Sequence, residues 1–175
     1  MKQIKPLRAV AFTFKAKREA IFAFSNPESP LPIIYQMGKV GSSTVYKSLM
    51  NTSLSNPILH LHFLSQDLSK HRRTLKQAGV YPPPYHIYLG EATRKLLNRH
   101  QDVPIKIISL VRDPIACLIS DIFQNPYFAE ESILTDTGSI DSQKASRYID
   151  RNLSDPNAFT YIFEWFNREL KTVFG

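Results

Sequence analysis

A short segment, Gly38–Thr44, combines glycine, lysine and hydroxyl residues in a way that suits the binding of an anion. It follows an apolar run, Leu31–Met37, and precedes a stretch with helical character, Val45–Met50. At a strand–loop–helix junction, the unpaired N–H groups and the positive end of the helix dipole converge on one point. We therefore expect an anion here, the alternative being a tight turn with an N-cap serine. The residues that would hold the anion are Lys39, Gly41, Ser42, Ser43 and Thr44.

The order of these residues differs from that of two common phosphate-binding loops. In a Walker A loop the lysine directly follows the second glycine, whereas Lys39 precedes Gly41 by two positions. A dinucleotide-binding loop needs a third glycine, which this segment lacks. The segment therefore matches neither pattern.

Arg112 and Ser120 form a second candidate anion site. Arg112 follows the apolar run Ile105–Val111, and parallel sheets place their ligand groups at the carboxyl ends of strands. Pro114 then opens a helix whose buried stripe is expected to be Ile115, Leu118, Ile119 and Ile122. Ser120 falls on the opposite side of this helix, so it and Arg112 can hold one phosphate. The alternative is that Arg112 pairs with Asp113 or another carboxylate and that Ser120 is merely solvated.

The elements that must position these residues are short strands alternating with helices. Strands are predicted at Leu31–Met37, Pro57–Leu64 and Ile105–Val111. This alternation indicates an α/β fold with a short parallel sheet covered by helices on both faces. The expected helices are Val45–Met50, a stretch from the N-cap Ser65 to about Gly79, Glu91–His100, Pro114–Gln124, Ser142–Asn152, and Pro156–Lys171 with Asp155 as its N-cap.

A proline-rich stretch, Asn26–Pro32, separates a basic leading segment from the rest of the chain. We expect residues 1–30 to carry a short amphipathic helix at Lys15–Phe24, which packs on the body or lies on an acidic surface; packing is favoured. Residues 31–175 are expected to form one domain, which carries both candidate anion sites.

The composition limits the class of protein. Of 175 residues, 43% are hydrophobic, which excludes a disordered chain. No apolar run approaches the ~20 residues of a membrane-spanning helix, and no signal peptide is recognisable, so we expect a cytoplasmic protein. The single cysteine, Cys117, excludes an intrachain disulfide and is expected to be a small buried or half-buried helix residue. A net charge of +7 favours an anionic partner.

Taken together, these segments resemble the sulfotransferases that use 3'-phosphoadenosine 5'-phosphosulfate (PAPS). Gln36–Thr44 resembles their Lys-x-Gly-Ser/Thr-Ser/Thr loop, and Ile108–Ser120 resembles the later strand that ends in Arg, with a Ser eight positions on. The Arg-Asp-Pro sequence at Arg112–Pro114 is similar to that of carbohydrate sulfotransferases, and Phe163–Leu170 resembles a bacterial group assigned to capsular polysaccharide synthesis. Family members are longer, so the resemblance implies a P-loop-like three-layer αβα fold that lacks the family's C-terminal part.

The resemblance implies transfer of a sulfuryl group from PAPS to a hydroxyl of a carbohydrate acceptor, without a metal. Lys39 would bind the phosphosulfate bridge, and the loop hydroxyls would hold the 5'-phosphate. Arg112 and Ser120 would select the 3'-phosphate that distinguishes PAPS from ATP. The acceptor is expected to be anionic, because basic residues are frequent in two predicted helices.

His60 and His62 are candidates for the base that accepts the acceptor's proton. They alternate along the second predicted strand and so point to one face, and histidine suits proton transfer near neutral pH. His60–Leu64 resembles the His-x-His segment of uronosyl 2-O-sulfotransferases, where the second histidine is the base, which favours His62. Glu91 is a further candidate. Zinc would need a third ligand, and neither Asp67 nor His71 has a telling spacing.

Other function classes stay open. A P-loop kinase or NTPase would prefer ATP with magnesium, and a non-catalytic relative would bind nucleotide without turnover. A nucleic-acid-binding module is a third alternative, although no recognised motif accompanies its basic residues, which are more simply a solvated helix face. These residues are Lys70, Arg72, Arg73, Lys76, Arg94, Lys95 and Arg99.

Overall fold

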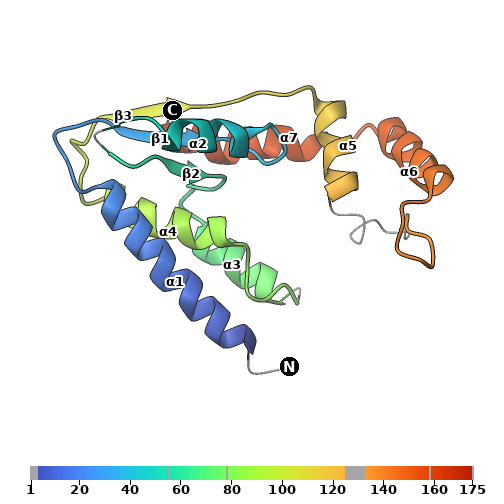
Figure 1. The fold of residues 1–175 in the computed structure, drawn as a ribbon, viewed down its shortest axis with the longest axis horizontal. Coiled ribbons are helices and arrows are strands. Elements are labelled where there is room, and N and C mark those ends of the chain that lie inside the picture. The colour runs from blue at the N-terminus through green and yellow to red at the C-terminus, as the bar shows by residue number, and fades with distance from the viewer. Residues whose placement is uncertain (1–3, 55, 78, 125–132, 158, 175) are drawn as a thin grey trace.

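The computed structural model describes residues 4–174 except 55, 78, 125–132 and 158. It is a mixed α/β fold, about 55% helical, built on an open sheet of three parallel strands (Figure 1). The strands are β1 (Leu31–Tyr35), β2 (Leu59–Leu61) and β3 (Ile105–Ile108), in the spatial order β2-β1-β3. The predicted α/β class, the three strands and their parallel pairing are thus confirmed.

Helices lie on both faces of this sheet and beyond one edge. Figure 1 shows α2 on one face, α7 and η2 on the other, and α1 with α4 beyond β2. α5 lies past the carboxyl ends of the strands, next to α6. The bounds are α1 Ile4–Ala23, α2 Ser42–Met50, α3 Leu68–Gln77, α4 Tyr85–Leu97, α5 Pro114–Gln124, α6 Ser142–Ser154, α7 Thr160–Trp165, the π-helix η2 Phe166–Lys171 and α8 Thr172–Phe174.

The register of β1 and β2 determines which side chains share a face. Ile33 pairs with Leu59 and Tyr35 with Leu61, and all four are fully buried. Ile34 pairs with His60, so both lie on the opposite face. Because side chains alternate along a strand, Gln36 and His62 follow on that second face. Tyr46 of α2 stacks on His60, with ring centroids 5.3 Å apart, so α2 covers this face.

The N-terminal helix is longer than the short helix predicted at Lys15–Phe24. α1 has 20 residues and packs along α4 through a row of buried alanines. Pro6 lies in its first turn, where a missing N–H costs nothing, so it does not shorten the helix. The preference for packing on the body is confirmed. The buried alanines are Ala9, Ala16, Ala20 and Ala23.

α4 begins at Tyr85, six residues before the predicted start at Glu91. Pro84 is its N-cap, a position where proline does not interrupt hydrogen bonding. Gly90 is buried inside the helix, and an added Cβ would collide with the carbonyl oxygen of Phe63. Gly90 therefore permits the close approach of α4 to the segment after β2.

Several other predicted elements need correction. β3 ends at Ile108 and leaves residues 109–113 as an extended link to α5, in which Val111 is 97% exposed. Ser65 does not cap α3, because its hydroxyl and N–H bind Glu169 instead. The helix predicted from Pro156 begins only at Thr160, and Asp155 is the C-cap of α6.

The inward face of α5 also differs from the predicted stripe. Ile122 is buried as predicted, but Ile115 is 44% exposed, and Cys117 is buried in its place. Cys117 is turned toward the β1–α2 loop, where its Sγ lies 3.8 Å from the carbonyl oxygen of Lys39. The helix is therefore rotated toward the loop relative to the prediction.

Candidate functional site

The loop between β1 and α2 has the backbone of an anion-binding turn. Lys39 and Gly41 both have positive φ angles, 70° and 88°, and Gly41 is the N-cap of α2. Since glycine has no side chain, no side-chain bond caps the helix, and the N–H of Thr44 bonds the carbonyl oxygen of Gly41 at 3.1 Å. Ser42 is buried, whereas Ser43 and Thr44 are exposed. The loop thus joins the positive end of α2 to exposed hydroxyl groups.

Arg112 lies directly against this loop. Its Nη1 donates a hydrogen bond of 3.0 Å to the carbonyl oxygen of Lys39, although 73 positions separate the two residues. The carboxylate of Asp113, which the sequence offered as an alternative partner of Arg112, accepts from the N–H of Ala116 at 3.0 Å and so caps α5. Ser120 is half-buried on α5. The structure therefore brings together the loop and Arg112, the two anion-binding elements predicted from the sequence.

Three imidazole rings cluster beside the loop. His60 and His62 of the predicted pair lie 4.9 Å apart between ring centroids, and His86 of α4 lies 4.1 Å from His62 and 5.2 Å from His60. Burial lowers the pKa of His60 and of His86 to about 4, aided by the neighbouring imidazoles. All three rings are therefore uncharged near neutral pH. His86 is not singled out by the sequence, because the predicted helix begins after it.

His62 has the hydrogen bonding of a proton acceptor. Its Nδ1 lies 2.9 Å from the carbonyl oxygen of Gln36, which can only accept, so Nδ1 carries the hydrogen and Nε2 the lone pair. Burial lowers its pKa, the bond to Gln36 opposes this, and the charge of Lys39 lowers it further. An uncharged imidazole with a free Nε2 lone pair can accept a proton from a hydroxyl.

Two polar groups in this region are buried without a hydrogen-bond partner. Both side-chain polar atoms of Gln36, a fully buried residue, are unpaired, and so is Nε2 of His60. An unpaired buried amide costs about 1–3 kcal/mol, so such a group normally has a partner. Gln36 directly follows β1 and precedes the loop, so its amide is a further candidate ligand group that the sequence pattern does not indicate.

The C-terminal helices hold the strand ends in place from the other face of the sheet. Trp165 Nε1 donates to the carbonyl oxygen of His62 at 2.8 Å. The buried carboxylate of Glu169 accepts from Tyr35 Oη at 2.7 Å and from the N–H groups of Leu64 and Ser65 at 2.7 and 2.8 Å. Both residues lie in the segment predicted as one ordinary helix. They fix the backbone on which His62 is carried.

The remaining candidates behave differently from the core of the site. Glu91 is engaged by Arg72 at 3.1 Å in a groove formed by α1, α3 and α4, which leaves it poorly suited to act as a base beside Lys39. Asp67 precedes α3, and its backbone carbonyl oxygen accepts the N–H of His71 at 2.9 Å. Within the described ranges, no group of three histidine, cysteine, aspartate or glutamate residues is arranged to hold a metal ion.

Comparison of the chain with models of known families, with curated proteins and with solved structures gives no match.

Proposed function

We propose that the chain binds PAPS and transfers its sulfuryl group to a hydroxyl of a carbohydrate acceptor, on a P-loop-like fold. The observation that carries this proposal is the 3.0 Å bond between Arg112 and the Lys39 carbonyl. It brings the loop that would hold the 5'-phosphosulfate next to the arginine that would select the 3'-phosphate. A mononucleotide with phosphates at both ends needs two such cationic groups within one site.

The residues at the loop fit an anionic nucleotide. Gly41 leaves the start of α2 without a side-chain cap, and both polar atoms of the Gln36 amide lack a partner inside the protein. Arg112 donates a hydrogen bond to the carbonyl oxygen of Lys39, so two cationic residues are neighbours at the loop. Ser43 and Thr44 add exposed hydroxyl donors.

The chain's own residues then have distinct roles. When bound, PAPS supplies the activated sulfuryl group. Lys39 and the N–H groups of α2 stabilise negative charge that develops on the bridging oxygen. His62 Nε2 accepts the proton of the attacking hydroxyl, while Gln36 holds the opposite nitrogen of the ring in its hydrogen-bonded form.

Calorimetric titration with 3'-phosphoadenosine 5'-phosphate (PAP), ADP and ATP tests the nucleotide site. We expect PAP to bind more tightly than ADP, and Arg112→Ala to weaken PAP binding about tenfold or more while it affects ADP far less. Arg73→Ala, which removes an exposed arginine on α3, should change the affinity for neither PAP nor ADP. Equal losses for PAP and ADP would limit Arg112 to supporting the Lys39 carbonyl and would refute its role in selecting the 3'-phosphate.

The same titration separates the proposal from its nearest rival. A P-loop kinase or NTPase would bind ATP with magnesium in preference to PAP. A preference of that kind would overturn the assignment of PAPS as the donor. PAP binding without any sulfuryl transfer to acidic oligosaccharides would instead support a non-catalytic relative.

A further inference from the structure

α1 exposes large apolar side chains to solvent along most of its length. At 100° per residue, Leu7, Val10, Phe14 and Ile21 fall within a stripe about 60° wide, and the buried alanines face the opposite side. α1 therefore packs on the protein with small residues and presents its largest ones outward. The residues of this exposed stripe, with the adjacent Phe22, are Leu7, Val10, Phe14, Ile21 and Phe22, each more than half exposed.

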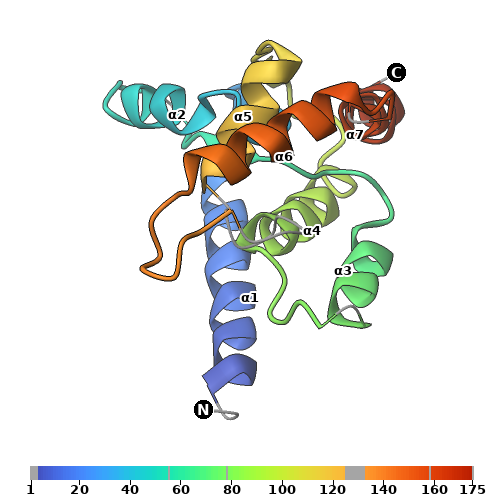
Figure 2. The same ribbon diagram turned by 90° about the vertical axis from the view of Figure 1, so that its right-hand side faces the viewer.

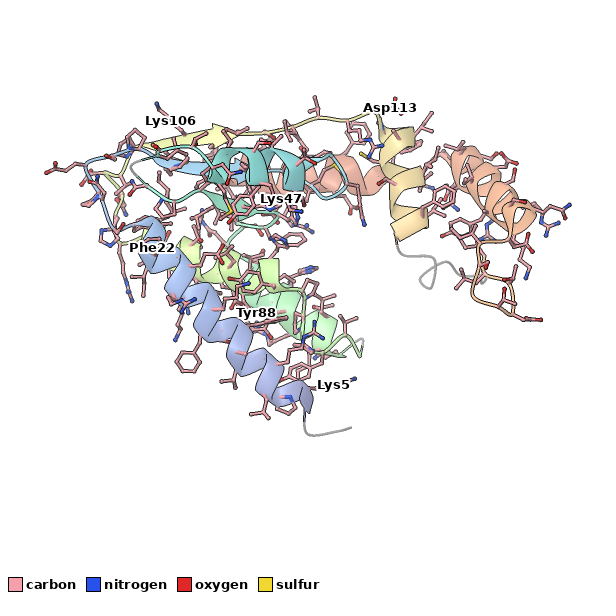
Figure 3. All side chains as sticks on the ribbon, viewed as in Figure 1. Lys5, Phe22, Lys47, Tyr88, Lys106 and Asp113 are labelled. Carbon is pink, nitrogen blue, oxygen red and sulfur yellow. The ribbon has the colours of Figure 1, made fainter. Side chains whose placement is uncertain are left out.

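The position of α1 makes this stripe accessible. α1 lies at the edge of the molecule, and its N-terminal end projects past α3 and α4 (Figure 2). Figure 3 shows Tyr88 on the inner side, between α1 and α4. Contiguous exposed apolar surface on a soluble domain marks a site of contact with another molecule or a membrane.

The surroundings of the stripe are strongly basic. Lys17 lies beside the stripe residues on α1, and a groove of about 500 Å³ between α1 and α4 is lined by Lys17, Arg72, Lys95 and Arg99. The carboxylate in that groove, Glu91, is engaged by Arg72. The one acidic side chain of α1, Glu19, accepts a hydrogen bond from Tyr85. The other cations of α1 are Lys5, Arg8, Lys15 and Arg18.

We propose that this face of α1 docks on an anionic lipid bilayer. Large apolar side chains on one stripe, flanked by lysine and arginine, are the features of helices that lie in the plane of the membrane interface. Leu7, Phe14 and Ile21 enter the boundary of the acyl chains, and Lys17 with Arg18 reaches the lipid phosphates. The groove beside α1 supplies further cations for headgroups.

Other occupants fit these observations less well. A second copy of the same face would bring two rows of cations together, which like-charge repulsion opposes. A single-stranded nucleic acid could stack bases on Phe14 and Phe22, but Leu7, Val10 and Ile21 offer no stacking face, and Tyr88 in the basic groove is only 5% exposed and is covered by Arg72. Neither occupant explains an exposed row of leucine, valine and phenylalanine as directly as a bilayer does.

Co-sedimentation of the full chain with vesicles tests this proposal, independently of any catalytic activity. We expect binding to vesicles of phosphatidylcholine mixed with phosphatidylglycerol and little binding to phosphatidylcholine alone. Leu7→Gln/Phe14→Gln should reduce binding by about tenfold or more, because two inserted side chains are lost. Lys17→Gln/Arg18→Gln should also reduce it, and added salt should weaken the wild-type chain.

Matched controls make the outcome specific. Met50→Gln/Phe163→Gln removes apolar side chains that are 60% and 68% exposed on α2 and α7, and should leave binding unchanged. Failure of the wild-type chain to bind anionic vesicles would overturn the proposal. Equal losses of binding in Leu7→Gln/Phe14→Gln and in the control Met50→Gln/Phe163→Gln would also overturn it. If light scattering showed a dimer that Leu7→Gln/Phe14→Gln dissolves, with no vesicle binding, the face would instead contact a second copy.

Discussion

At the scale of single residues, one hydrogen bond determines how His62 can act. Because the Gln36 carbonyl occupies Nδ1, the lone pair of the ring is at Nε2, and burial keeps the ring unprotonated. His60 lies in β2, two residues before His62, but its Nε2 is buried without a partner. The sequence places both residues on one face; only the contacts of each ring distinguish them.

We predict that His62→Ala lowers sulfuryl transfer by about a hundredfold or more and leaves PAP binding unchanged, since a general base contributes to the chemical step. Release of PAP in the presence of acidic oligosaccharides measures the first quantity, and calorimetry measures the second. His100→Ala is the control, because His100 is an exposed histidine after α4. Undiminished transfer by His62→Ala would exclude this residue as the base.

The pH dependence of transfer provides a second test of His62. A base must be unprotonated to act, and its pKa lies below the ordinary value of about 6.5. Transfer should therefore be maximal at neutral pH and decline only once the pH falls below about 6.5. A decline centred above that value would indicate a different base.

At the scale of elements, the sequence predicts those whose signals are local. The apolar run before Gly38 and the run at Ile105 both become strands, and Pro114–Gln124 is a helix with the predicted bounds. The predicted strands are longer than the observed ones. β2 and β3 each pair only with β1, so each strand ends where that pairing ends. Apolar character continues beyond the residues that find a hydrogen-bonding neighbour.

Features that depend on tertiary contacts could not be predicted. The place of His86 in the histidine cluster depends on the early start of α4 at Tyr85. The close packing of α4 against Phe63 depends on the missing side chain of Gly90. From the sequence alone Glu169 would be taken for a surface residue of a helix, but its five donors come from two distant parts of the chain, Tyr35 and Leu64–Ser65, and from its neighbour Arg168. No spacing in the sequence records such contacts.

We predict that Glu169→Ala destabilises the fold by on the order of 4 kcal/mol, because it leaves Tyr35 and the N–H groups of Leu64 and Ser65 without an acceptor. Glu169→Gln, which keeps the shape and one acceptor oxygen, should cost less. Urea denaturation measures both. Glu164→Ala removes an exposed carboxylate from α7 and should change stability by less than about 0.5 kcal/mol. Similar losses of stability in Glu169→Ala and Glu164→Ala would refute the role of η2 in holding the strand ends.

At the scale of the whole molecule, the proposed anion site and the proposed membrane-docking face lie on different elements. The proposed anion site comprises the β1–α2 loop, the link after β3, His60 of β2, His62 just after it and His86 of α4. The proposed docking face is formed by α1 and the groove beside it. α4 connects the two, because it carries His86 in its first turn and packs along α1. A bilayer on α1 would therefore leave the loop accessible.

The buried histidines also link global stability to pH. In the folded state the pKa of His60 and of His86 is about 4, whereas in the unfolded chain both groups titrate near 6.5. The unfolded state therefore binds more protons between these values, and stability must fall as the pH decreases from about 6.5 to about 4. We predict a loss on the order of 3 kcal/mol across this window, measured by urea denaturation at several pH values. His60→Phe/His86→Phe should flatten the decline, whereas His100→Gln should not; an equally steep decline in the double variant would show that other groups cause it.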